Sequence, residues 1–247
     1  MSTLRLVVMV ALAVIATACT VTETGNPPFA GQMALTADTS DPDVVGLGGG
    51  TGAAIVEEAW VGIGDIRFVR AVVCDAPGET EVDVPGPVIA ELVAEPAVVS
   101  VELAGDDYCR VRVPLDRVGA LPSGAPPDLV DRSVVLLGRR SDGTPFRIAS
   151  RIERESDVRS RGAPFELSEG LRAVVLAFDL ALWLEDVDLG TATVDADGTI
   201  RVDDDTNRDL LDAFEASAER ALRLFRDTDQ DGVLDPEDRT ELLAEAL

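Results

Sequence analysis

The sequence predicts a mainly β protein, in which an antiparallel β-sandwich is followed by a C-terminal α helix-loop-helix. Two observations lead to this expectation. Between residues 54 and 154, short apolar or alternating runs are separated by turn signals at regular intervals, a pattern typical of sandwiches and open barrels. Near the C-terminus, two amphipathic segments flank an aspartate-rich run, which indicates two short helices joined by a polar loop.

The strands are expected in a simple order along the chain. Residues 31–37 form the first strand, and residues 54–74 form one long strand or two shorter ones, because Gly62 and Gly64 interrupt the run. Further short strands are expected at Val88–Ala94, Val98–Leu103, Tyr108–Leu115, Ser133–Arg139 and Phe146–Ile152. Residues 174–184 are apolar on both faces and predict a long central strand, and residues 192–202 predict a hairpin that turns at Asp195–Gly198.

The C-terminal segment, residues 203–247, has helical spacing on both sides of its acidic run. Apolar residues recur three or four positions apart before the run: Leu210, Leu211, Phe214, Ala218, Ala221, Leu222 and Phe225. After the run, Asp235 suits a helix N-cap and Pro236 the first helical position, and a short leucine stripe follows. We therefore expect a helix, a loop and a second helix of about three turns.

The loop between these helices is the one run that specifies a chemistry. Carboxylates occupy loop positions 1, 3, 5, 9 and 12, which are Asp227, Asp229, Asp231, Asp235 and Asp238. The carbonyl of Val233 at position 7 can supply a main-chain ligand, and Gly232 at position 6 permits a sharp turn. Hard cations take six to eight oxygen ligands of this kind, so these six residues are candidate Ca²⁺ ligands. Leu234 is apolar and is expected to tuck beneath the loop.

This run resembles the calcium loop of the EF-hand family and the aspartate-rich calcium repeats of thrombospondin-type and dockerin modules. The resemblance covers residues 206–247 and implies calcium binding. Asp238 departs from the pattern, because EF-hands place a bidentate glutamate there, and its shorter side chain predicts a weaker site or a preference for Mg²⁺. The other interpretation is an acidic, solvated turn. A second, degenerate loop runs through Thr193, Asp195, Asp197, Gly198, Ile200 and Asp204, but it begins without a carboxylate and has strand-like flanks.

The composition excludes several function classes. The formal charge is −25, all 21 basic residues are arginine, and the chain has no lysine and no histidine. Nucleic-acid binding needs clustered cationic side chains, and a chain with this net negative charge is not expected to form such a cluster. The absence of histidine removes Ser-His-Asp and Cys-His catalysis and the usual zinc sites, and the absence of lysine removes Schiff-base chemistry.

The N-terminus predicts export. Arg5 precedes an apolar stretch, residues 6–15, which is too short to span a membrane, and residues 16–18 lead into Cys19. This arrangement resembles the bacterial lipoprotein signal, which implies cleavage after residue 18 and acylation of Cys19. A lipid anchor would attach the protein to a membrane of the cell envelope, and Thr20 favours the outer membrane. The other interpretation is ordinary secretion with Cys19 free or removed.

Four regions follow from these predictions: a signal peptide over 1–18, a lipidated tether over 19–30, a β-sandwich over 31–202 and the helix-loop-helix over 203–247. Export also makes a disulfide between Cys74 and Cys109 plausible, since both lie in strand-like runs. Such a bridge would stabilise the fold by about 3–4 kcal/mol. Two free buried thiols are the alternative.

The β region resembles lipoprotein domains of unassigned function with a transthyretin-like or immunoglobulin-like sandwich. The resembling residues are 64–68, 105–113 and 165–167 leading into 177–179. We therefore expect a non-catalytic, membrane-anchored calcium-binding lipoprotein in which Ca²⁺ orders the C-terminal loop. Two alternatives remain: a protein-docking or self-association module that uses the acidic helical tail, and a hydrolase with two carboxylates, for which no spacing singles out a pair.

Overall fold

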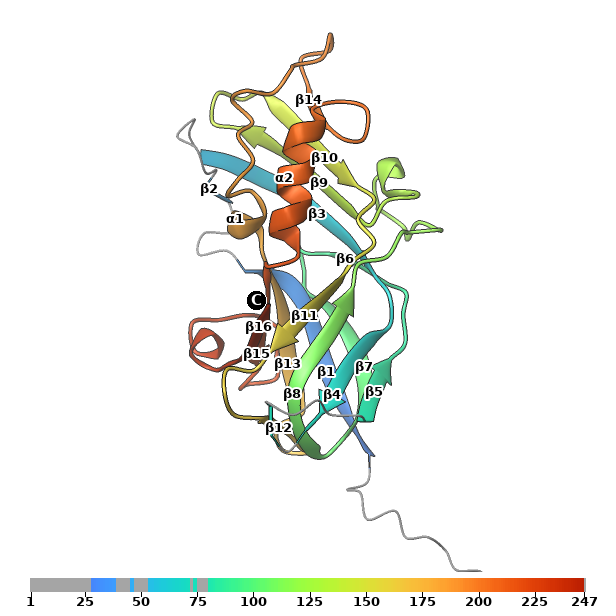
Figure 1. Ribbon diagram of the computed structural model, residues 1–247, viewed down its shortest axis with the longest axis vertical. Coiled ribbons are helices and arrows are strands. Elements are labelled where there is room, and N and C mark those ends of the chain that lie inside the picture. Colours follow the sequence, from blue (N-terminus) through green and yellow to red (C-terminus); the bar gives the residue numbers. More distant parts are fainter. Residues whose placement is uncertain (1–27, 39–44, 47–52, 72, 75–79, 247) are drawn as a thin grey trace, which may run out of the picture.

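A computed structural model describes residues 28–38, 45–46, 53–71, 73–74 and 80–246. The predicted signal peptide, Cys19 and most of the tether lie outside these residues. The described chain is mainly β and forms two sheets in a sandwich-like arrangement, so the predicted fold class is confirmed. Figure 1 shows the smaller sheet in the upper half of the molecule and the larger sheet below it.

The larger sheet has ten strands, of which nine follow the order β5-β4-β8-β11-β16-β15-β13-β1-β7, while β12 pairs with β8. Their bounds are β1 Pro28–Asp38, β4 Ile66–Arg70, β5 Thr80–Val84, β7 Ala97–Ala104, β8 Asp106–Pro114, β11 Glu155–Arg159, β12 Phe165–Leu167, β13 Ala173–Asp179, β15 Leu222–Arg226 and β16 Leu242–Ala246. The smaller sheet has the order β14-β10-β9-β3-β2, and β6 pairs with β3. Its bounds are β2 Val45–Gly46, β3 Ala53–Ile63, β6 Val88–Glu91, β9 Val134–Arg140, β10 Pro145–Ser150 and β14 Ile200–Val202.

Most neighbouring strands are antiparallel, as expected, but two pairs are parallel. β1 pairs with β13 and β10 pairs with β14 in parallel register, which the antiparallel pattern expected from the sequence does not include. The partners in each pair are far apart in sequence, and sequence patterning does not indicate which distant strands become neighbours. Residues 54–74 form two shorter strands rather than one, because β3 ends at Ile63 and β4 begins at Ile66.

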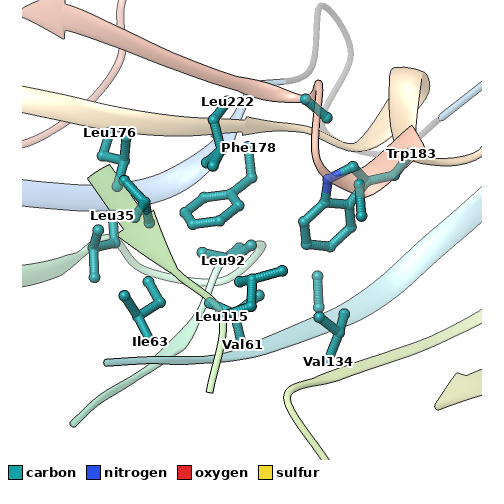
Figure 2. Packing of buried hydrophobic residues seen from close by; sticks show 14 of the residues in the cluster. Leu35, Val61, Ile63, Leu92, Leu115, Val134, Leu176, Phe178, Trp183 and Leu222 are labelled. Atoms are coloured by element: carbon teal, nitrogen blue, oxygen red, sulfur yellow. The ribbon is translucent and has the colours of Figure 1, made fainter. Parts of the chain in front are cut away.

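One core joins the two sheets. It takes inward-facing side chains from both, and Figure 2 shows Phe178 of the larger sheet close to Val61, Leu92 and Leu115. Trp183 is fully buried, with its ring centroid 5.7 Å from that of Phe178 and 5.6 Å from that of Phe214. Phe214 belongs to helix α2, Arg208–Ala218, which crosses the smaller sheet in Figure 1. No described helix is long and apolar enough to cross a membrane.

The predicted central strand ends earlier than expected. β13 stops at Asp179, whose side chain accepts a hydrogen bond from the backbone N–H of Leu182 at 2.9 Å. This cap starts a short helix, α1, Leu180–Trp183. The apolar residues after Asp179 therefore reach the core from a helical turn, which an apolar run alone does not distinguish from a strand.

The predicted C-terminal helix-loop-helix is wrong. Helix α2 ends at Ala218, and residues 222–226 form strand β15, which pairs with β13 and contributes Leu222 and Leu224 to the core. After the loop there is a single 3₁₀ turn, η2 (Asp238–Thr240), and then strand β16. Residues 222–246 thus supply two neighbouring strands within the larger sheet. Leucines at this spacing satisfy a helical pattern as well as a strand, and pairing with neighbouring strands of the larger sheet decides between them.

The predicted disulfide is confirmed. Cys74 and Cys109 form a disulfide, with their Cα atoms 5.1 Å apart. The two cysteines are 35 residues apart in the sequence. Cys109 lies in β8 and is buried. The bridge ties the segment after β4 to β8, its neighbour in the larger sheet.

Candidate metal centre

The aspartate-rich loop connects two neighbouring strands of the larger sheet. It leaves β15 after Arg226, whose N–H donates to the carbonyl of Glu241 at 3.0 Å, just before β16 begins. The N–H of Asp227 donates to the carbonyl of Ala173 in β13 at 3.2 Å. Both ends of the loop are therefore fixed to the sheet by main-chain hydrogen bonds.

The loop folds back over the outer face of the sheet. Leu234 is 9 % exposed and packs against four sheet residues, which confirms that it tucks beneath the loop: Ala34, Val175, Ala177 and Phe225. Gly232 has a φ of +78°, and a Cβ there would lie 3.3 Å from Cγ2 of Val98. A left-handed backbone and a close neighbour both favour glycine at this position.

Three aspartates come together at the start of the loop. One carboxylate oxygen from each of Asp227, Asp229 and Asp231 lies within 4.8 Å of the others. Asp227 is buried, whereas Asp229 and Asp231 are exposed. No arginine of the described chain forms an ion pair with any of the three. The arrangement is therefore an acidic cluster of oxygen donors that has the chemistry of a hard-cation site.

Asp227 is the anchor of this cluster. Its side chain is 5 % exposed, and its two oxygens accept hydrogen bonds from the N–H groups of Gln230 at 2.7 Å and Gly232 at 3.0 Å. Burial raises the pKa of Asp227 above its usual range, although these two hydrogen bonds act in the opposite direction. The negative charges of Asp238 and Asp229 also raise this pKa, so a cation beside Asp227 would relieve an electrostatic cost.

Asp238 closes the loop from its far end. It is fully buried, and its Oδ1 accepts hydrogen bonds from both the N–H and the hydroxyl of Thr228, at 2.9 and 2.8 Å. Asp235 uses Oδ1 to accept from the N–H groups of Glu237 and Asp238, at 2.6 and 3.0 Å, and so caps the 3₁₀ turn. Both carboxylates are within the loop but outside the cluster of three. At the remaining predicted position, Val233 donates its N–H to Oδ1 of Asp231 at 2.7 Å.

The degenerate second loop has a different arrangement. The side chains of Asp195 and Asp197 both form ion pairs with Arg201. The N–H of Asp195 donates to the carbonyl of Thr199 at 2.9 Å. Arg201 lowers the pKa of Asp197 through a charge-assisted hydrogen bond. An arginine therefore already compensates these two carboxylates, in contrast to Asp227, Asp229 and Asp231.

Sequence reasoning missed the residues that tie the end of the loop to the sheet. Arg239 in η2 forms an ion pair with Asp38 at the end of β1. The same buried Asp38 pairs with Arg223 of β15 at 2.9 Å, and Arg223 also pairs with Asp179 at 3.0 Å. Asp38 and Arg239 are 201 residues apart, so no local pattern could have indicated their contact.

Comparisons with known proteins give little further information. No model of a known protein family matches this chain. No curated protein matches it in sequence. One solved structure, "MbnP from Methylosinus trichosporium", aligns with 69 % of this chain and 82 % of its own, at 14 % sequence identity and a TM-score of 0.37. A likeness at this level supports no inference about function.

Proposed function

We propose that this protein is a non-catalytic lipoprotein of the bacterial cell envelope that binds Ca²⁺ in its C-terminal aspartate-rich loop as a structural ion. The observation that carries the proposal is the cluster of Asp227, Asp229 and Asp231, whose carboxylate oxygens lie within 4.8 Å of one another. Carboxylates at this separation repel one another, and the attraction of a bound divalent cation to all three would outweigh that repulsion.

The donor set supports a hard cation. Every candidate ligand atom is an oxygen, which suits Ca²⁺ or Mg²⁺ rather than a metal that prefers nitrogen or sulfur. Asp229 and Asp231 are exposed, so water can complete the coordination shell. We favour Ca²⁺ because it accepts irregular geometry, whereas Mg²⁺ demands a near-ideal octahedron. Asp227, Asp229, Asp231 and the carbonyl of Val233 would bind the ion, while Asp235 and Asp238 hold the loop in shape.

The setting of the loop supports a structural role rather than a signalling one. A calcium sensor needs a pair of helices that rearranges when the ion binds. Here the loop joins two neighbouring strands, and Leu234 and Arg239 attach it to the sheet. The ion would therefore stabilise the connection between β15 and β16. The same two strands bear on the alternative of a docking tail: deleting residues 203–247 would remove both from the sheet, so a loss of self-association after this deletion would not by itself indicate docking.

The proposed location rests on the N-terminal sequence. Acylation of Cys19 would anchor the chain in a membrane, and we place it at the outer membrane. Mass spectrometry of the protein purified from a bacterial membrane fraction tests this part. The expected mass lacks residues 1–18 and includes acyl chains on Cys19. An intact N-terminus, or an unmodified Cys19, would contradict the anchor and leave the calcium proposal standing.

Thermal unfolding tests the metal. The protein is stripped with a chelator and melted alone, with Ca²⁺ and with Mg²⁺. An ion at 100 times its dissociation constant stabilises the folded state by about 2.7 kcal/mol. We expect the melting temperature to rise with Ca²⁺ more than with Mg²⁺, and Asp231→Asn to remove most of the rise. An unchanged melting temperature at millimolar Ca²⁺ would contradict the proposal.

A further inference from the structure

The arginines of this protein divide sharply into two groups. Arg5 lies outside the described residues, and 18 of the remaining 20 arginines lie within 4.0 Å of a carboxylate oxygen. Only Arg172 and Arg226 of the described chain do not. Acidic residues outnumber basic ones by 46 to 21, so an arginine without a carboxylate partner is unexpected in this protein.

Both of these arginines line pockets. Arg226 lies in the wall of a pocket of about 410 Å³. Arg172 lines a second pocket of about 580 Å³, but its side chain is exposed and donates through Nε to the side-chain oxygen of Gln230 at 3.3 Å. Arg226 is more enclosed. Its Nη2 donates to the carbonyl of Glu166 at 3.3 Å, and its Nη1 is buried without an acceptor.

The pocket around Arg226 arises from a gap in the larger sheet. β11 pairs with β16 only at its last residues, Val158 with Ala246 and Arg159 with Glu245. The chain then leaves β11 and returns as β12, which pairs with β8 instead. The pocket opens between this returning segment and residues 242–245 of β16.

The pocket walls combine apolar surface with Arg226, which has no carboxylate oxygen within 4.0 Å among the described residues. Pro164, Phe165, Leu242 and Leu243 provide the apolar part, and Leu242 is 41 % exposed. Two carboxylates also line the pocket: Glu245 forms an ion pair with Arg161, and Glu166, whose side chain is exposed, forms no ion pair within the described chain. Arg226 therefore keeps a positive charge in a partly apolar space. A buried guanidinium donor without an acceptor calls for a missing partner, which is either a water molecule or a ligand.

We propose that this pocket binds a small organic anion, with a carboxylate or a similar oxyanion on Arg226 and an apolar body against Phe165, Leu242 and Leu243. The volume is within the range of small-molecule sites, and the planar guanidinium matches a planar oxyanion. The net charge of the protein repels free anions, so the apolar body must supply part of the affinity. This site is separate from the aspartate cluster and does not depend on calcium binding.

A fluorine NMR titration of the full-length purified protein with para-trifluoromethylbenzoate tests the proposal, because this probe carries a carboxylate on an apolar ring. We expect saturable binding at one equivalent. Arg226→Gln should weaken it about 10- to 100-fold, which corresponds to about 1.4–2.8 kcal/mol. The neutral amide of the probe should bind the wild-type protein about as weakly as the acid binds Arg226→Gln. Arg172→Gln is the matched control and should leave the affinity within about twofold.

A second variant covers the case in which Arg226→Gln fails to fold. Leu242→Asp places a negative charge at an exposed position in the pocket wall and should weaken binding of para-trifluoromethylbenzoate at least as much as Arg226→Gln does. Absence of saturable binding, equal affinities for the acid and the amide, or a loss confined to Arg172→Gln would each overturn the proposal. An affinity unchanged by both Arg226→Gln and Leu242→Asp would also overturn the proposal, because the probe would then bind elsewhere and water would be the partner of Arg226.

Discussion

Leu234 holds the aspartate-rich loop against the sheet, and its truncation tests that role. Leu234→Ala removes three carbon atoms from the contact with Ala34, Val175, Ala177 and Phe225. At about 0.8 kcal/mol for each buried methylene, the lost transfer free energy is about 2.4 kcal/mol. Leu234 is 9 % exposed and lies at the surface of the sheet, so the site can partly collapse. We therefore expect the free energy of unfolding to fall by about 2–3 kcal/mol, the low end for such substitutions.

Urea unfolding in the presence of a chelator measures this cost without any contribution from a metal ion. Val233→Ala is the matched control, because Val233 is the preceding residue and is 48 % exposed. Its free energy of unfolding should change by less than about 0.5 kcal/mol. For a chain of this size, the expected loss in Leu234→Ala lowers the melting temperature by about 4–12 °C. Equal stabilities of the two variants would refute the conclusion that Leu234 fastens the loop to the sheet.

Three further predictions concern Tyr108, Gly232 and the disulfide. Burial raises the pKa of Tyr108 above its ordinary value of 10.0, so the free energy of unfolding should fall as the pH rises from about 10 through the folded-state pKa. Tyr108→Phe should remove this fall. Because the chain has one tyrosine, tyrosinate absorbance reports its titration directly. Gly232→Ala should lower the free energy of unfolding by about 1–3 kcal/mol and weaken calcium binding in calorimetry. Gly198→Ala is the control: Gly198 also has a positive φ, +83°, but no neighbour within 4 Å, and its substitution should leave calcium binding unchanged. Replacing Cys74 and Cys109 by alanine should lower the free energy of unfolding in urea by about 3–4 kcal/mol, and an unchanged value would contradict the loop-closure argument.

The alternating β runs could be predicted because the side-chain period of a strand is visible in sequence. The strands expected at 98–103, 108–115 and 133–139 correspond to β7, β8 and β9 within two residues at each end. Strands β15 and β16 were missed because their leucines also fit a helical period. They become strands through tertiary pairing: β15 pairs with β13, β16 pairs with β11, and the two pair with each other.

The candidate site was predictable in part for a similar reason. The spacing of Asp227, Asp229 and Asp231 is a local pattern, and the structure brings their oxygens together. The ion pair between Asp38 and Arg239 joins residues far apart in the chain, so the sequence could not indicate it. The capping role of Asp235 was expected, but the helix that it begins stops after one 3₁₀ turn, because the chain then joins the sheet as β16.

Calorimetric titration with Ca²⁺ after chelator treatment tests the central claim most directly. The account predicts saturable binding at one equivalent, lost in a variant with Asp227→Ala and Asp231→Ala and retained in Asp197→Asn. Two equivalents would assign an ion to the Asp195–Asp197 turn as well, despite its pairing with Arg201. Absence of binding heat together with an unchanged melting temperature at millimolar Ca²⁺ would contradict the account and leave the loop as an acidic turn.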